Sequence, residues 1–249
     1  MFIGNKTIRN FGPSWVQSNL YSWNGRRELI QANLCSLSTM STHNASSSDT
    51  MSLSFDQLYK SLIAHPSPLL PPQIPLSKST THEISNLQVH PTLETALHIL
   101  NHDLESAHFL VRHMQAPPQH EAMFLHGILH RIEGDYDNTR AWYGDVADSE
   151  VFTKVWKGGK EEAFKFVRRV EVLRKERKSE GWHDDDGEER QDLEKESGRE
   201  IDAVVQFCVD KFGTERWADV SSEWAQPRGG KVAEQKQKMV VGGEGFRNF

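Results

Sequence analysis

The chain has 249 residues, of which 37% are hydrophobic, with a formal net charge of −6 and a mean hydropathy of −0.63. This composition allows a hydrophobic core, but not one that extends over the whole length. No run approaches the roughly 20 apolar residues of a membrane-spanning helix, so we expect no membrane partner. The negative charge makes nucleic acid an unlikely partner. Two cysteines, Cys35 and Cys208, are too few for a disulfide framework or a cysteine-rich zinc site.

Residues 1–50 are predicted to be a disordered or targeting segment. They contain four Lys or Arg and only two acidic residues, and their second half is rich in Ser, Thr and Asn. This composition fits a mitochondrial transit peptide. It equally fits a disordered tail, or a true start at Met40 or Met51. We therefore expect a cytoplasmic protein, with a mitochondrial location as the alternative.

A short helix is predicted within residues 51–65, followed by a proline-rich linker over residues 66–90. Phe55, Leu58 and Leu62 recur at helical spacing. Ser54 and Gln57 have the spacing of a capping box. Half of the ten prolines lie between residues 66 and 77, which predicts an extended linker outside the core.

Residues 91–225 are predicted to form the helical domain. Apolar residues recur at helical spacing from Pro91 to Met114, with a possible break at Asn101 to Asp103, and Pro117 marks the end of this region. Further helices are predicted over residues 121–132 and 136–146. Gly134 is the expected C-terminal turn residue between them, and Asp135 is the expected N-cap.

A charged insertion is predicted at about residues 154–200. Its first part, residues 154–180, has ten basic and five acidic residues, and keeps an apolar helical stripe that begins at Ala163. Residues 181–202 have three basic and ten acidic residues, which predicts a solvated loop around Asp184 to Asp186. A final packed helix is expected over residues 201–212, and a disordered tail over residues 226–249.

These elements predict an all-α fold. No segment alternates with the period of two that a half-buried strand requires. We expect helical hairpins packed as a small irregular bundle, with disordered N-terminal and C-terminal segments. The hairpins within residues 92–147 should pack together, and the helix at residues 201–212 should cover them.

The segment EAMFLHGILHRIEGDYDNTRAWYGDV, residues 121–146, resembles a single tetratricopeptide unit. Gly127 falls at the small position where the two helices touch, and Gly134 to Tyr136 match the turn. The segment departs from the pattern at His126 and His130, where apolar and aromatic residues are usual. Stable arrays need about three repeats, and no second clear copy follows. The resemblance therefore implies a helical hairpin and not a solenoid.

The string HGILHRIEGDYDNTRAWY, with HDLESAH upstream, also resembles a family of uncharacterised fungal and bacterial proteins. Members share a His-x3-His-Arg-x-Glu-Gly-Asp run, followed by an Asn and a Tyr/Trp pair. This resemblance implies a helical core and no particular activity.

Eight of the twelve histidines lie between residues 90 and 130. His126, His130 and Glu133 have the spacing i, i+4, i+7, which places them on one face of a helix. His98, His102 and Glu105 repeat this spacing, but only if the helix continues through Asn101 to Asp103. Two imidazoles one turn apart, with a carboxylate one turn further, can hold a metal ion.

We therefore predict a polar pocket between two hairpins that binds a small ligand or a divalent metal. Its expected residues are His108, His126, His130, Glu133, Asp135 and Asn138. If a metal binds, its expected ligands are His126, His130 and Glu133, and zinc, iron and manganese all suit such a set. Arg131 is expected at the rim of the site.

Two alternatives stay open at this point. The histidines could hydrogen-bond only to one another and to the hairpin turn, with Asp135 and Asn138 acting as cap residues. The chain could also be a non-enzymatic, tetratricopeptide-like module that binds a protein partner. No catalytic motif indicates a reaction, so whether the protein is an enzyme is left undecided.

Overall fold

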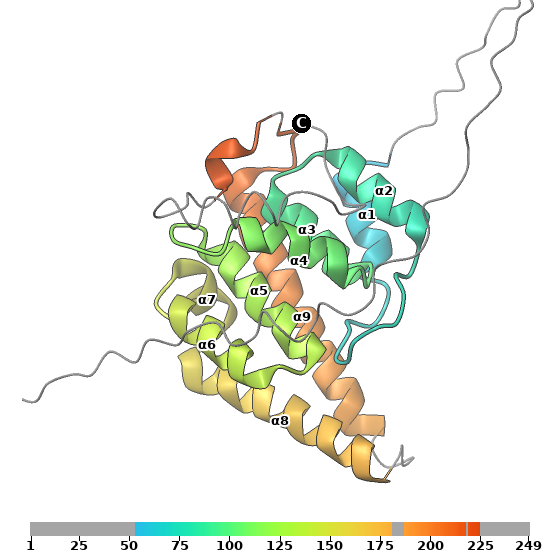
Figure 1. Cartoon of the computed structure of the whole chain (residues 1–249), viewed down its shortest axis with the longest axis vertical. Helices are drawn as coiled ribbons and strands as arrows, with labels where there is room; N and C mark the ends of the chain where they lie inside the picture. The colour runs from blue at the N-terminus through green and yellow to red at the C-terminus, as the bar shows by residue number, and fades with distance from the viewer. Residues whose placement is uncertain (1–52, 181–186, 218, 225–249) are drawn as a thin grey trace, which may run out of the picture. The chain divides into compact units, whose positions relative to one another are not determined.

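The computed structural model describes residues 53–180, 187–217 and 219–224, with the backbone alone at 177–180. These residues form α-helices and one short 3₁₀ helix without any strand, which confirms the all-α prediction (Figure 1). The helices are α1 (Phe55–Leu62), α2 (Lys78–Leu87), α3 (Pro91–Leu100), α4 (Leu104–His113), α5 (His120–Glu133), α6 (Tyr136–Val146), α7 (Glu150–Val155), α8 (Gly159–Glu180), α9 (Gly187–Phe212) and η2 (Ser221–Glu223). The predicted N-terminal segment, C-terminal tail and acidic loop at 184–186 lie outside the described residues.

Two helical hairpins, α3/α4 and α5/α6, form the centre of the domain and pack against each other, as predicted. The α3/α4 turn falls at the predicted break, where His102 has a positive φ of 61°. In the α5/α6 turn, Gly134 has a φ of 85°, a backbone conformation that glycine adopts without strain. Asp135 caps α6 by accepting a hydrogen bond from the Asn138 backbone N–H.

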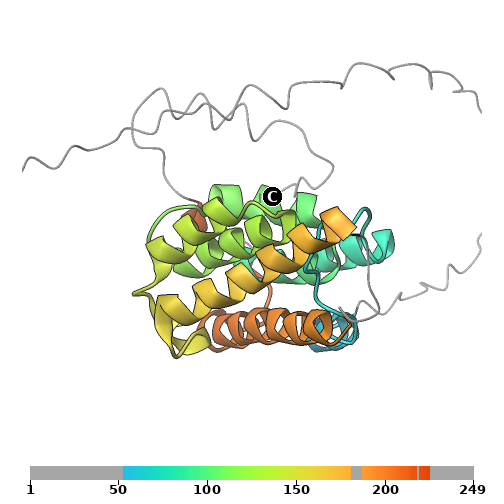
Figure 2. The same cartoon turned by 90° about the horizontal axis from the view of Figure 1, so that it is seen from below.

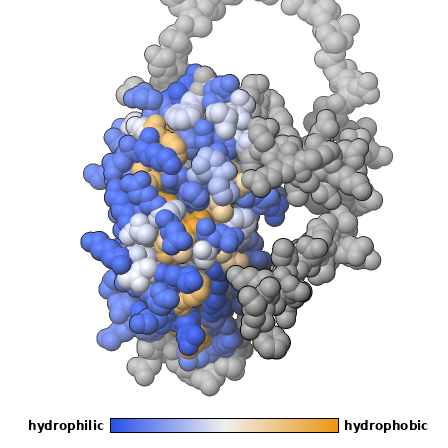
Figure 3. Space-filling view, turned by 90° about the vertical axis from the view of Figure 1, so that its left-hand side faces the viewer, coloured by the Kyte–Doolittle hydropathy of each residue, from blue (hydrophilic) through white to orange (hydrophobic). Residues whose placement is uncertain are grey.

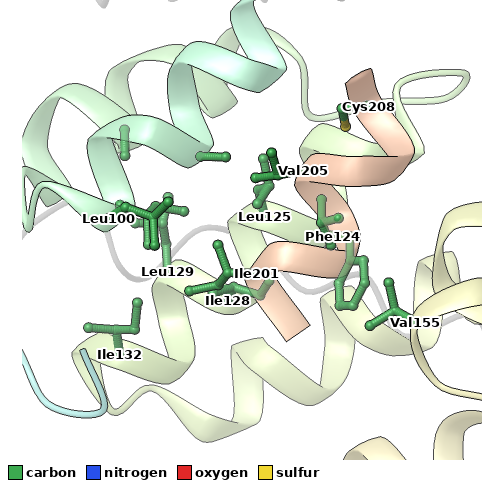
Figure 4. Close-up of a cluster of buried hydrophobic side chains, with 14 of the residues drawn as sticks. Leu100, Phe124, Leu125, Ile128, Leu129, Ile132, Val155, Ile201, Val205 and Cys208 are labelled. Atoms are coloured by element: carbon green, nitrogen blue, oxygen red, sulfur yellow. The ribbon is translucent and has the colours of Figure 1, made fainter. Parts of the chain in front are cut away.

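Helix α5 is surrounded by other helices and is buried on nearly every side. It contacts α3, α4, α6 and α7. Figure 4 shows its apolar residues, among them Leu125, Ile128 and Leu129, against Ile201 and Val205 of α9. A helix in this position has no solvent-facing stripe, which explains why 11 of its 14 residues are buried.

Helix α9 covers the hairpins on one side, and α8 crosses beside it (Figure 2). The predicted helix over 201–212 is therefore the last part of a longer one. The charged insertion is part of the core, because Leu193 and Ser197 of α9 and Phe166 and Val170 of α8 are buried. No described helix combines the length and the apolar character needed to cross a membrane.

The predicted proline-rich linker is partly helical, because α2 occupies residues 78–87. Its first part is also attached to the fold. Leu69 is buried, and the Asn101 side chain donates a hydrogen bond to the Ser77 backbone carbonyl at 3.0 Å. The Ser77 side chain caps α2. Residues 66–90 thus hold α1 and α2 against α3, which the prediction of a free linker missed.

Candidate functional site

Three histidines predicted from the sequence come together where α4, α5 and α6 meet. His108 extends from the middle of α4, and His126 and His130 from successive turns of α5. Glu133 follows one turn later, in the last turn of α5. We call these four residues the histidine cluster. It joins the two hairpins, as the predicted pocket required.

The imidazole rings of the cluster are in mutual contact. His126 and His130 stack with ring centroids 4.8 Å apart and an angle of 17° between planes. The His108 ring lies edge-on to both, with centroid distances of 5.3 Å to His126 and 5.5 Å to His130. On its other side, His126 stacks against the Trp142 indole at 4.5 Å.

Glu133 orients the cluster from its outer edge. Its Oε1 lies 2.8 Å from His108 Nε2, a close ion-pair contact, although the two atoms do not have the geometry of a hydrogen bond. Its Oε2 lies 3.6 Å from His130 Nδ1, too far for a hydrogen bond. The Nδ1 atoms of His108, His126 and His130 are all buried without a hydrogen-bond partner in the protein.

Burial keeps two of these imidazoles neutral. Desolvation, followed by the charges of His130, His108 and Arg112, lowers the pKa of His126 to about 2. Desolvation and then His108 lower the pKa of His130, although Glu133 and Asp135 oppose this. Burial would raise the pKa of Glu133, but the close contact with His108 and its charge lower it overall. At neutral pH the cluster therefore holds an ionised carboxylate beside two neutral imidazoles.

The cluster is largely closed to solvent. His126 and His108 are 5% and 8% exposed, whereas the Glu133 side chain is 38% exposed. Glu133 is therefore the group that an incoming molecule would meet first. A surface depression of about 320 Å³ lies beside the same α5/α6 turn and is lined in part by Asp135 and Arg174.

Asp135 and Asn138 form their hydrogen bonds with each other at the start of α6 and not with the imidazoles. The Asn138 side-chain amide donates to Asp135 Oδ2 at 2.7 Å, and the Asn138 side chain is exposed. Both residues serve the α6 N-terminus, which is the cap role left open as the alternative.

The second histidine triple is not assembled. His98 lies in the last turn of α3, whereas His102 lies in the α3/α4 turn itself, where the helix is interrupted. The ring of His98 is buried between two carboxylates, with Nε2 3.8 Å from Glu94 Oε1 and Nδ1 3.4 Å from Asp103 Oδ2. Burial would lower the pKa of His98, but the nearby carboxylates of Asp103 and Glu94 raise it overall. His98 is thus part of a separate polar contact that stabilises this turn.

The geometry does not support the predicted metal set. Within the described part of the chain, no group of three His, Cys, Asp or Glu residues is placed to hold a metal ion. His126 and His130 stack face to face, and Glu133 is turned towards His108 instead.

Two residues of the site were missed by the sequence analysis. Trp142 covers His126, and the charge of Arg112 on α4 acts on His126, His130 and Glu133. Gly127 was the available signal for Trp142. A Cβ at Gly127 would lie 3.1 Å from Trp142 Cβ, so the close approach that glycine allows brings Trp142 beside the neighbouring His126.

The prediction for Arg131 is wrong, because Arg131 is fully buried and points away from the rim. Its Nη2 donates to Glu200 Oε2 at 2.8 Å and to Ser197 Oγ at 3.0 Å. The Tyr143 hydroxyl and the Trp156 indole N–H donate to Glu200 Oε1 at 2.6 and 3.1 Å. This Arg131–Glu200 network ties α5, α6 and α7 to α9. The error arose from assuming that α5 has an exposed face.

Comparison with known proteins gives no match: no family model, no curated protein and no solved structure is similar to this chain. The resemblance to a tetratricopeptide unit therefore gains no support beyond the hairpin itself.

Proposed function

We propose that this helical domain binds a small polar ligand through the histidine cluster. The observation that carries the proposal is the convergence of three imidazoles and one carboxylate from two hairpins, with three Nδ1 atoms unpartnered. Buried polar atoms without partners cost free energy. Apolar side chains would join the hairpins at lower cost, so the imidazoles are better explained by a ligand that supplies the missing partners.

Each residue of the cluster has a role in this proposal. Glu133 and His108 form a pair at the entrance, with the carboxylate Oε1 2.8 Å from Nε2. Trp142 holds the ring of His126 in place by stacking. His130 lies between them and offers a nitrogen that the protein leaves unused. The ligand would enter beside Glu133.

Native mass spectrometry of the chain, purified without a histidine tag, tests the proposal. We expect a bound small molecule in the wild type that is lost in His130→Ala and retained in His82→Ala. His82 is a matched control because it is an exposed histidine on α2. Metal analysis of the same samples separates an organic ligand from a metal ion.

A purely structural cluster gives a different result. His130→Ala would then destabilise the protein by about 1–3 kcal/mol, the cost of stranding buried polar partners. No bound molecule would be found in either the wild type or the control. That outcome would contradict the proposal.

One face of the molecule offers no support for the alternative of a protein-interaction module. The face of the molecule in Figure 3 is mostly hydrophilic, and its hydrophobic side chains lie in short patches between charged residues. Large apolar patches are the usual mark of a docking surface. The described side chains on this face form no such surface.

A further inference from the structure

We infer that the ligand of the histidine cluster is a small organic cation that carries N–H donors, such as a primary ammonium compound. The inference rests on the proposed binding function and adds the chemical class of the ligand. It follows from the spacing of two acceptors, the charge around them and the position of the cluster on α5.

The spacing at the entrance suits one donor atom. Glu133 Oε2 and His130 Nδ1 lie 3.6 Å apart, so they do not bond to each other. A single nitrogen placed about 2.9 Å from each could donate to both. The Nδ1 of His108 is also buried without a hydrogen-bond partner in the protein. The site thus offers acceptors that an ammonium group can satisfy.

The charge of the surroundings favours a cation. Glu133 is ionised and is the last residue of α5, where the helix dipole presents partial negative charge. Asp135 follows at the turn, and its charge acts on His130. Two guanidinium groups supply the opposing positive charge: Arg112, an exposed residue on α4, and Arg174 of α8, whose Nη1 donates to the Ile132 carbonyl at 3.5 Å. The Glu133 carboxylate is the charge that lies directly against His108 and His130, so it dominates at the entrance.

An anion fits the same groups poorly. A phosphate or carboxylate near His130 would lie within a few ångströms of the Glu133 carboxylate, and like charges repel strongly at that distance. Its approach from solvent would also pass Glu133, the most exposed member of the cluster. The exposed Arg112 would attract an anion only through solvent-screened charge.

Titration of the full chain with putrescine tests the ligand class. Imidazole ¹⁵N signals of His108 and His130 report occupancy at pH 7.5. We expect saturable shifts with putrescine that weaken at least about tenfold in Glu133→Gln, since a charge-assisted hydrogen bond contributes about that factor. Arg112→Gln should instead strengthen binding a few-fold, because it removes a like charge. His82→Gln is the neutral control.

Phosphate and zinc ions serve as competing probes under the same conditions. Saturable shifts of the cluster with phosphate or zinc, but not with putrescine, would overturn the cation class and leave the binding function intact. Putrescine binding that is unchanged in both Glu133→Gln and Arg112→Gln would also overturn it. If no probe shifts the cluster and the native protein carries no ligand, both the ligand class and the binding function fail.

Discussion

At the scale of single residues, Glu200 illustrates how a buried charge depends on its partners. Its carboxylate accepts hydrogen bonds from Arg131, Tyr143 and Trp156, and it has no exposed surface. An ion pair in such a place need not stabilise a fold more than apolar residues would, but loss of one partner strands the other charge. The network is therefore most sensitive to changes that remove one charge.

We predict that Glu200→Gln destabilises the protein by about 3–5 kcal/mol, because Arg131 would keep its charge without a buried counter-ion. Glu196→Gln is the matched control on the same helix. Glu196 pairs with Arg199 near the surface, where ion pairs contribute about 0–1 kcal/mol. Urea unfolding followed by circular dichroism measures both changes. Equal stability of the two variants would contradict the role assigned to the network.

At the scale of secondary-structure elements, the α5/α6 contact depends on Gly127. A Cβ at this position would lie 2.7 Å from Tyr143 Cδ1 and 3.1 Å from Trp142 Cβ, closer than packed atoms normally approach. The two helices can therefore touch only where the side chain is absent. Gly144 of α6 is also helical, but a Cβ there would meet nothing within 4 Å.

These two glycines give opposite predictions for the same substitution. Gly127→Ala should destabilise the protein by at least about 1 kcal/mol, because overpacking outweighs the gain in helix propensity. Gly144→Ala should stabilise it by about 0.5–1 kcal/mol, since only the propensity changes. Thermal unfolding of both variants tests the pair. A stabilised Gly127→Ala would show that α6 can move away without cost.

The hairpins at 91–147 were predictable because turn residues and stop signals separate their apolar stripes. Helix α2 was missed because Ile84 is its one buried apolar residue. The first part of α9 was missed because two of its buried positions, Ser197 and Glu200, are polar. They therefore add nothing to the apolar spacing from which a buried helix face is predicted. The periodicity of apolar residues predicts which apolar side chains are buried, but it does not predict which polar side chains are buried as pairs.

Part of the candidate site was likewise predictable from local spacing, and part was not. Spacing along one helix predicted that His126, His130 and Glu133 share a face, and hairpin packing predicted His108 beside them. The roles of Asp135 and Asn138 depend on which way the turn directs them, which spacing alone does not determine. The burial of Arg131 depends on α9, an element more than 50 residues away in the sequence. The spacing of residues within one helix does not predict contacts with partners so distant in the sequence.

At the scale of the whole molecule, buried histidines make the free energy of unfolding depend on pH. Some of them stabilise the fold more at high pH, and one stabilises it more at low pH. Burial lowers the pKa of His126, His130 and His90 in the folded protein, so the unfolded chain binds more protons at acid pH. Stability from these residues is present above about pH 6.5 and is lost as the pH falls below that value. His98 has the opposite sign. Its raised pKa contributes stability that is present below about pH 6.5 and lost as the pH rises through the folded value.

We therefore predict that the free energy of unfolding decreases between pH 7 and pH 5. His126, with a folded pKa of about 2, should contribute about 2 kcal/mol of this loss by itself. His98 is protonated in both states over most of this range and should contribute little to the slope. Urea unfolding at pH 7, 6 and 5 measures the profile.

The variant His126→Gln isolates this contribution, because glutamine keeps a polar side chain that does not titrate. Its absolute stability will differ from that of the wild type, since the stacking of the His126 ring on His130 and on Trp142 is lost. The slope with pH is therefore the proper readout. It should be shallower than the wild-type slope by about 2 kcal/mol over two pH units, whereas His82→Gln should keep the full slope. If His126→Gln instead retains the wild-type slope, His126 accepts its proton within the folded protein and the closed, neutral form of the cluster is wrong.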